Sequence, residues 1–502
     1  MRDGANLRAD HYVPATAKPC GVLLLRSPYG RRGLFPQITA GLYAERGYHV
    51  LLQSVRGTFG SDGAFYPGAD EVADGADTVD WLRGQSWFSG RFATVGASYL
   101  GLTQWAQLVS PPAELVTAAI TMGPHDFAFT SWSTGSYTLA DLFGWSLQIA
   151  EQEISGSIRR LINAFTFLRR INPAMTTLPL AEAGGSSFAS GAPWHRDWLE
   201  HSNPHDEYWN PARMTSALDS SSIPVLLVGG WQDVFADQTL EQYQRLRQRG
   251  VDVALVVGPW THAQGGGDAV RESLAWLDEH LGGRPRGMSR VRIFVTGGAG
   301  WRDLDHWPPA SGEFVLYPGV GSVLVGAPPI EDGSSSRFSY DPADPTPTVG
   351  GRLLFGNGGY RDDTRLATRP DVVAFTGPPL DEDLEVIGTP RIELSHSTDL
   401  PWADVFVRIS EVDRKGRSHN VSDGFVRLNP ERSPLLCLDM DAMAHRFRAG
   451  NRIRLIVAGG SFPRFARNLG TGEPTATGTT LARCTHTVTH AGSRLILPVP
   501  EL

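Results

Sequence analysis

Three residues of the types that cooperate in nucleophilic catalysis each follow a predicted buried strand. Ser98 lies in Gly96-Ala-Ser-Tyr-Leu-Gly, directly after the short strand Phe92-Ala-Thr-Val, and Asp233 and His262 follow two later apolar segments. A serine hydroxyl group is a poor nucleophile until a base within hydrogen-bond reach removes its proton. A histidine oriented by a carboxylate can be that base. We therefore expect Ser98 to be a nucleophile, His262 its base and Asp233 the residue that orients His262.

Each of these residues is weak evidence by itself. A Gly-x-Ser before a helix is more often an ordinary turn with a capping serine, and loop histidines and aspartates are usually solvated. The serine motif also has Leu100 where the common elbow has glycine, with Gly101 one position later. The chain order Ser, Asp, His, with each residue after a buried strand, nevertheless matches the order used by α/β hydrolases. The combination favours the catalytic interpretation.

Two further groups are placed to stabilise an oxyanion. The backbone N–H of Tyr99 is next to the nucleophile, and Tyr29 follows the first predicted strand in Arg26-Ser-Pro-Tyr-Gly. A neutral phenol stays protonated at working pH and can donate a hydrogen bond. A tyrosine that only packs in a loop would have the same position in the sequence, so position alone leaves both interpretations of Tyr29 open.

The elements that must position these residues alternate in the first part of the chain. The apolar segments Gly21-Val-Leu-Leu-Leu-Arg and Tyr48-His-Val-Leu-Leu-Gln predict strands buried on both faces. Helical spacing predicts helices at 34–46 and 70–82. Strands alternating with helices indicate a parallel, doubly wound sheet, whose carboxyl edge is where ligands bind. The three catalytic candidates should meet at that edge.

Two other regions have a different character. Residues 127–210 are aromatic-rich and predominantly helical in pattern, which predicts a helical cap inserted before the sheet resumes. Beyond about residue 311, short alternating segments separated by Gly, Pro and Asp indicate an antiparallel sandwich. We expect a first core segment at 1–125, the cap at 126–215, a second core segment at 216–310 and a β domain at 311–502.

Composition excludes several other classes of protein. The chain has 502 residues, 41% of them hydrophobic and 20% charged, and a net charge of −8 without a basic run. Nucleic acid is therefore not expected as a partner, and no segment is long and apolar enough for a membrane span. The few cysteines do not form a metal or disulfide pattern. His201 and His205 have a metal-ligand spacing, but Pro204 interrupts a helix there. We expect no cofactor, no metal and a cytoplasmic location, and we leave a homodimer open.

Several motifs together resemble one known family. The motifs are Ser27-Pro-Tyr, Gly96-Ala-Ser-Tyr-Leu-Gly, Gly230-Trp-Gln-Asp, Gly258-Pro-Trp-Thr-His, Trp301-Arg-Asp, Tyr340-Asp-Pro-Ala-Asp-Pro and Phe462-Pro-Arg-Phe-Ala-Arg-Asn. This set, which spans nearly the whole chain, resembles the cocaine esterase family, a branch of the X-prolyl dipeptidyl-peptidase group that also includes α-amino-acid ester hydrolases. The resemblance implies an α/β-hydrolase core with a helical cap insertion and a C-terminal antiparallel β jelly-roll domain.

The resemblance also implies residue roles. The triad of the family falls on Ser98, Asp233 and His262, and its oxyanion tyrosine on Tyr29. An acyl pocket would be lined by aromatic and apolar residues, namely Trp132, Trp145, Phe235, Leu354 and Phe355, although ordinary core packing would explain each of them equally well. One departure is Ser54, which stands where relatives usually carry Asp.

Three functions are therefore considered. The first is a serine esterase that acts on small-molecule carboxylic esters with a bulky apolar acyl part. The second is an X-prolyl dipeptidyl-peptidase or an α-amino-acid ester hydrolase or acylase, which should have carboxylates in the pocket to hold a substrate ammonium group. The third is a jelly-roll binding protein with an inactive core, which the complete triad disfavours.

Overall fold

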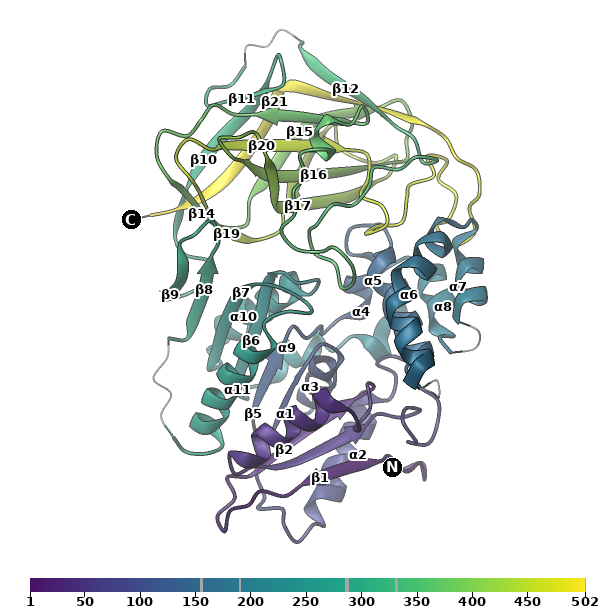
Figure 1. Ribbon diagram of the computed structural model, residues 1–502, viewed down its shortest axis with the longest axis vertical. Coiled ribbons are helices and arrows are strands. Elements are labelled where there is room, and N and C mark those ends of the chain that lie inside the picture. Colours follow the sequence, from purple (N-terminus) through teal and green to yellow (C-terminus); the bar gives the residue numbers. More distant parts are fainter. Residues whose placement is uncertain (154–156, 189–190, 285–288, 330–332, 502) are drawn as a thin grey trace.

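The computed structural model describes residues 1–153, 157–188, 191–284, 289–329 and 333–501. An α/β core forms one end of the molecule and a strand-rich C-terminal domain the other, with a group of helices beside the junction (Figure 1). The predicted fold class, an α/β-hydrolase core with a helical cap and an antiparallel β domain, is confirmed. Among the described residues, no helix is both long enough and apolar enough to cross a membrane.

The core is built on one sheet, which has nine strands within the described residues, in the order β1-β3-β2-β4-β5-β6-β7-β8-β9. Neighbouring strands from β3 to β8 run parallel, and β1 and β9 are antiparallel edge strands. The strands are β1 Ala9–Tyr12, β2 Val22–Ser27, β3 His49–Ser54, β4 Phe92–Ala97, β5 Leu115–Thr121, β6 Val225–Gln232, β7 Val253–Thr261, β8 Val291–Val295 and β9 Gly300–Leu304.

Helices cover both faces of this sheet, because the central strands are apolar on both sides. In β2, Val22 and Leu24 belong to the hydrophobic cluster that includes side chains of α2, α3 and α10, whereas Leu23 and Leu25 belong to the cluster with α1 and α11. The core helices are α1 Leu34–Glu45, α2 Glu71–Arg83, α3 Tyr99–Val109, α10 Ala236–Gln248 and α11 Gly266–His280.

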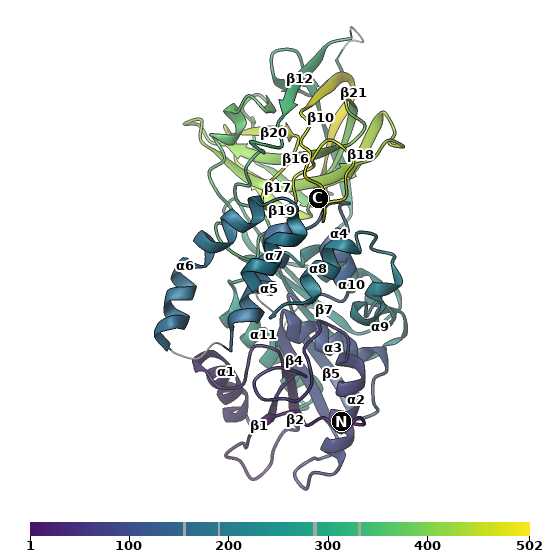
Figure 2. The same ribbon diagram turned by 90° about the vertical axis from the view of Figure 1, so that its right-hand side faces the viewer.

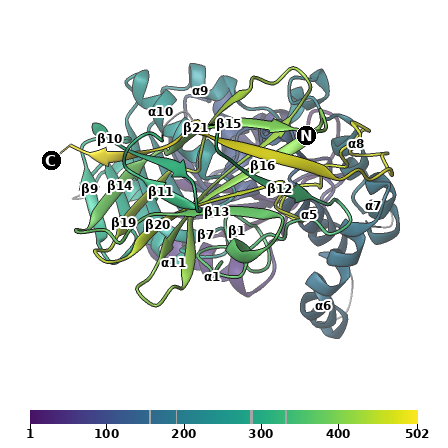
Figure 3. The ribbon, with the colours of Figure 1, turned by 90° about the horizontal axis from the view of Figure 1, so that it is seen from above.

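The described residues between β5 and β6 form the helical cap. Its aromatic side chains pack together, with Trp145 stacked on Trp198 at 6.0 Å between ring centroids. The helix α6 projects from the body of the molecule (Figures 2 and 3). The elements are α4 Phe127–Trp132, α5 Leu139–Glu151, α6 Ser157–Thr176, α7 Leu180–Phe188, α8 Trp194–Glu200, η1 Glu207–Ala212 and α9 Ser216–Ser220.

The C-terminal domain consists of strands that are mostly antiparallel and enclose a separate hydrophobic cluster. Its sheet runs in the order β17-β16-β20-β13-β11-β10-β21-β15-β18; β12 pairs with β21, and β14 pairs with β19. The elements are β10 Ser311–Gly319, β11 Val323–Val325, β12 Ser335–Tyr340, η2 Leu366–Thr368, β13 Val372–Thr376, β14 Leu384–Gly388, β15 Arg391–Thr398, β16 Ala403–Val412, β17 Ser418–Leu428, β18 Leu435–Asp439, β19 Met443–Phe447, β20 Arg452–Ala458 and β21 Cys484–Pro500.

A loop of this domain reaches the cap next to the carboxyl edge of the core sheet. The backbone N–H of Leu354 donates to Asp141 Oδ1 of α5 at 2.7 Å. Phe355 lies against Gly144, where an added Cβ would come within 2.6 Å of the phenyl ring. Glycine at position 144 is therefore what lets the loop pack on α5. Core, cap and C-terminal domain all meet at this edge.

Candidate active site

Ser98 occupies a strained turn between β4 and α3. Its backbone has φ 61° and ψ −125°, a conformation that costs a non-glycine residue about 1–3 kcal/mol. The turn is tight: a Cβ on Gly96 would lie 2.5 Å from the Cβ of Leu100, and one on Gly101 would lie 2.4 Å from the Cα of Gly123. Gly101 therefore permits α3 to approach the loop after β5, and Leu100 fills the space over Gly96. This packing accounts for the departure from the common motif.

His262 and Asp233 form a hydrogen-bonded pair at the ends of β7 and β6. The His262 Nδ1 and Asp233 Oδ1 atoms are 2.6 Å apart, and Asp233 is completely buried. Asp233 Oδ2 accepts from the backbone N–H of Phe235 at 3.0 Å. With Nδ1 engaged by the carboxylate, Nε2 is the ring nitrogen available to a reacting group.

The side chains of Ser98 and His262 line the same cavity. A direct hydrogen bond between them is not among the contacts found in the described part of the chain. Hydrogen bonds of this kind are often long or poorly aligned until a ligand binds. The structure thus joins two of the three predicted residues directly and brings the third to the same cavity.

Tyr29 lies next to Ser98, the candidate nucleophile. Its hydroxyl group interacts with the Ser98 side chain and the Tyr99 backbone N–H, and it accepts a hydrogen bond from Trp145 Nε1 at 3.0 Å. Burial raises the pKa of the Tyr29 phenol above its usual value, so the hydroxyl group keeps its proton. Because Trp145 occupies one acceptor position, the phenol proton is free to point toward Ser98. Tyr29 and the Tyr99 N–H together can hold a developing oxyanion.

A buried charge network lies beside the two candidate oxyanion donors, and sequence analysis missed it. The Tyr99 phenol donates to Glu71 Oε1 at 2.8 Å, and Glu71 Oε2 lies 2.9 Å from Arg26 Nη2. Arg26 is on β2, three residues before Tyr29, and is held by Gln53 at 3.1 Å. Burial raises the pKa of the Glu71 carboxyl group, and the charge of Arg26 opposes this shift. The network ties the end of β2, just before Tyr29, to the start of α3.

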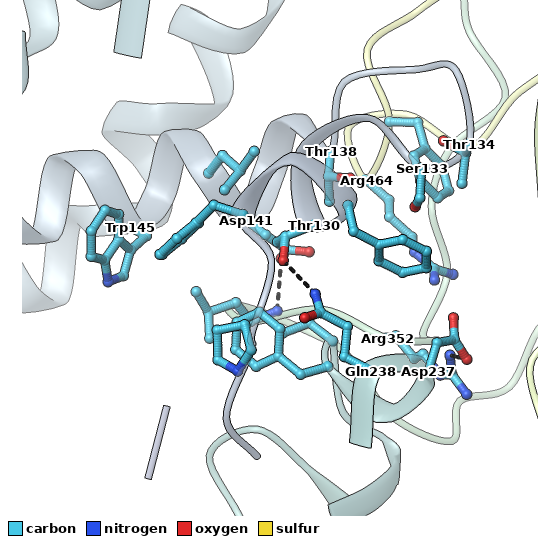
Figure 4. Close-up of a pocket in the computed structure, with 18 of the residues that line it drawn as sticks. Thr130, Ser133, Thr134, Thr138, Asp141, Trp145, Asp237, Gln238, Arg352 and Arg464 are labelled. Carbon is cyan, nitrogen blue, oxygen red and sulfur yellow. Dashed lines mark hydrogen bonds and ion pairs between the residues drawn. The ribbon is translucent and has the colours of Figure 1, made fainter. Parts of the chain in front are cut away.

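Two cavities meet at Ser98 and Tyr29. The first, here called the cap-side cavity, has a volume of about 110 Å³ and is bordered by the cap, α10 and the C-terminal domain (Figure 4). The second, here called the helix-side cavity, has a volume of about 550 Å³ and lies between the sheet and the helices α1 and α11.

The predicted pocket residues divide into two groups. Trp145, Phe235 and Leu354 line the cap-side cavity. Trp132 and Phe355 are not among the residues found to line it: the indole N–H of Trp132 donates to the carbonyl of Trp198 at 2.9 Å, and Phe355 packs on Phe167 with ring centroids 5.0 Å apart. Both lie in the packing that supports the cavity wall.

The cap-side cavity also has a charged wall that was not predicted. Arg352 Nη1 lies 2.6 Å from Asp237 and 3.0 Å from Asp441, and Arg464 lies 3.0 Å from Asp423. Asp141 differs from these carboxylates because the polar contact found for it in the described residues is with the backbone N–H of Leu354. Burial raises its pKa to about 6. An acidic residue within the apolar sequence Leu139-Ala-Asp-Leu-Phe was the available signal that a buried carboxylate stood there.

Ser54 and His201, which the sequence analysis singled out, each bind a nearby side chain. Ser54 is completely buried, and its hydroxyl accepts a hydrogen bond from Arg31 Nη1 at 2.6 Å. His201 Nδ1 lies 3.0 Å from an oxygen of Asp206, and its ring stacks on Tyr208.

Comparison with known proteins agrees with this architecture. The family model described as X-Pro dipeptidyl-peptidase (S15 family) matches residues 3–264, and the model described as X-Pro dipeptidyl-peptidase C-terminal non-catalytic domain matches residues 287–495. Cocaine esterase from Rhodococcus sp. (strain MB1 Bresler) is 31% identical, over 99% of this chain and 97% of its own length.

Solved structures share the whole fold. The structure of an α-amino-acid ester hydrolase has a TM-score of 0.82 at 22% identity, covering 99% of this chain and 95% of that one. An aminopeptidase from a marine sediment Thaumarchaeota archaeon has a TM-score of 0.85 at 23% identity, covering 99% and 94%. At these identities the likeness concerns the fold.

The protein is a serine hydrolase enzyme with an α/β-hydrolase core. It belongs to the X-Pro dipeptidyl-peptidase (S15) family, in which its sequence is similar to that of cocaine esterase along nearly its entire length.

Proposed function

We propose that the protein hydrolyses small carboxylic esters through an acyl-enzyme formed on Ser98. His262 takes the Ser98 proton as the hydroxyl oxygen attacks the ester carbonyl, and Asp233 stabilises the imidazolium. Tyr29 and the Tyr99 N–H receive the oxyanion. His262 then protonates the departing alcohol, and a water molecule activated by the same imidazole releases the acid.

The convergence of two separate hydrogen-bonded units on one point carries this proposal. The His262–Asp233 pair and the Tyr29–Trp145 pair come from different parts of the chain, and His262, Tyr29 and Ser98 all line the helix-side cavity. The 31% identity to cocaine esterase supports ester hydrolysis. An inactive core with a binding role would have no reason to keep the base, its orienter and both oxyanion donors together.

A fluorophosphonate probe followed by mass spectrometry tests the nucleophile. We expect labelling at Ser98 and none in Ser98→Ala, whose kcat for p-nitrophenyl acetate should fall by roughly 10⁶-fold. Ser110→Ala is the matched control, because Ser110 is an exposed serine at the other end of α3; labelling and activity should persist. Labelling at another serine, or an active Ser98→Ala, would refute the proposal.

Hydrolysis of amino-acyl esters or amides is the second candidate, and Asp141 is the observation in its favour. This buried carboxylate borders the cap-side cavity with Trp145 and Phe235, where it could accept an ammonium group. A panel of p-nitrophenyl esters against Xaa-Pro and amino-acyl p-nitroanilides separates the candidates. Faster turnover of the anilides would favour the peptidase, and we expect the esters to be faster.

A further inference from the structure

The helix-side cavity is a feature of the core that the comparison with relatives does not assign. Apolar side chains of the sheet, including Leu25, Leu52 and Val95, form its floor. Side chains of α1 and α11, including Tyr43 and Val270, form its walls. The two helices lie on the same face of the sheet (Figure 1). The exposed Gln264 and Gly266 also line the cavity, so it reaches the surface beside His262.

The position of His262 distinguishes the two cavities chemically. Ser98 and Tyr29 border both, but His262 is among the described residues lining the helix-side cavity and not among those lining the cap-side cavity. Phe235 stands between, with its ring 5.3 Å from the imidazole in an edge-on arrangement. His262 is therefore exposed to the helix-side cavity, on one side of Ser98.

Acyl transfer imposes a direction on an ester bound at such a site. The bond from Ser98 Oγ to the carbonyl carbon forms while the bond from that carbon to the alcohol oxygen breaks. The proton taken from Ser98 passes from His262 to the departing alkoxide, so the alcohol oxygen must lie next to the imidazole. The alcohol part of the ester then extends on the His262 side, and the acyl part extends toward Trp145 and Asp141.

We propose that the helix-side cavity binds the alcohol part of the substrate, and that this part is a long or bulky apolar group. This inference rests on the proposed esterase function. No Asp, Glu, Lys or Arg is among the described residues that line the cavity. An engineered apolar cavity of about 150 Å³ already binds benzene, and this cavity has about 550 Å³. The cap-side cavity, at about 110 Å³, has room for a small acyl group, in contrast to the bulky acyl part expected from the sequence.

Acetate esters of linear primary alcohols, from ethyl to octyl, test the assignment, with proton release as the assay. The kcat/KM should rise roughly three- to fourfold for each added methylene group that is buried. Ethyl esters with acyl chains lengthened to the same extent should show no such rise, because the cap-side cavity is too small.

Two tryptophan variants show where the alcohol chain lies. Val270→Trp places an indole in the helix-side cavity and should lower the octyl-to-ethyl ratio of kcat/KM at least tenfold. Ile38→Trp adds the same bulk to the outer surface of α1, at a residue that is 52% exposed and does not line the cavity in the described structure, and it should leave the ratio unchanged.

The outcomes separate this inference from the esterase proposal. If ethyl acetate is hydrolysed and Ser98 is labelled, but the rate does not depend on alcohol length, the cavity assignment is wrong and the esterase proposal stands. A rise that Val270→Trp leaves intact also overturns the assignment. If neither ester hydrolysis nor labelling of Ser98 occurs, the esterase proposal itself fails.

Discussion

The two cavities that meet at Ser98 are built from different parts of the molecule. All the described residues that line the helix-side cavity belong to the α/β core and come from the sheet, the helices α1 and α11 and the adjoining loops. The cap-side cavity needs three regions, because Trp145 comes from the cap, Phe235 from the core and Leu354 from the C-terminal domain. The helix-side cavity has mainly apolar walls, whereas the cap-side cavity has a wall of charged side chains. We infer that the core supplies the chemistry and the leaving-group side, whereas packing of the domains creates acyl selectivity.

Tyr29 borders both cavities, so its loss should affect every ester equally and have the largest effect after that of Ser98→Ala. Removing one oxyanion donor typically lowers kcat by about 10²–10³-fold, and we expect Tyr29→Phe to do so with little change in KM across both chain-length series. Tyr48→Phe is the control. It removes another buried phenol, bonded to Asp278 at 2.8 Å, that does not line either cavity in the described structure. If Tyr29→Phe lowered kcat in only one of the two chain-length series, Tyr29 would not serve both cavities.

Among the described residues, Arg352 lines the cap-side cavity and not the helix-side cavity, so its loss should affect the two cavities differently. The Arg352→Leu variant leaves Asp237 and Asp441 without their nearest cation, which should cost roughly 3 kcal/mol of unfolding free energy, the low end for a broken buried pair. Chemical denaturation measures the loss.

The matched variant for Arg352→Leu is Arg391→Leu, because Arg391 pairs with Asp439 at 3.0 Å on the exposed surface. It should cost no more than about 1 kcal/mol. Enzyme kinetics add a second comparison. The Arg352→Leu variant should raise KM for esters that differ in the acyl group, whereas the dependence of kcat/KM on alcohol length should persist. Equal costs for both arginine variants would mean that the cap-side wall does not depend on its buried charges.

The sequence was sufficient to predict the catalytic candidates, because Ser98, Asp233 and His262 each follow a buried strand and the carboxyl ends of parallel strands share one edge. It could not predict the wall of the cap-side cavity. Arg352 and Asp237 are more than a hundred positions apart, and nothing local marks them as partners. Likewise, the family resemblance offered Trp132 and Phe355 alongside Trp145, but whether an aromatic residue faces a cavity or supports it depends on the packing of whole domains. The predicted domain boundaries at 125, 215 and 310 stay predictions.

Asp141 gives the cap-side cavity a carboxyl group that can change its charge near neutral pH, whereas no Asp or Glu is among the described residues that line the helix-side cavity. Its raised pKa, about 6, means that the carboxyl group is mostly neutral at pH 5 and mostly charged at pH 7. A betaine ester carries a fixed positive charge in its acyl part, and the 3,3-dimethylbutyrate ester has the same shape without charge. The ratio of their kcat/KM values should therefore rise with pH through 6, by roughly tenfold.

Taking this ratio cancels any pH dependence of the catalytic step that the two esters share. Asp141→Asn should make the ratio independent of pH. A wild-type ratio that is already flat between pH 5 and 7 would show that the carboxylate does not face the acyl group.

The smallest predicted effect concerns Ser98 itself, where both cavities meet and where the turn is strained. Replacing an alanine by glycine ordinarily lowers stability by roughly 0.5–1 kcal/mol, because glycine loses more backbone freedom on folding. At φ 61° and ψ −125° the glycine variant should instead be the more stable of the two, because alanine keeps the strain of about 1–3 kcal/mol and glycine releases it. Ser98→Gly should therefore unfold at a slightly higher temperature than Ser98→Ala, by calorimetry at one scan rate. If Ser98→Ala is instead the more stable variant, the turn stores no strain, and backbone strain is not what presents Ser98 to both cavities.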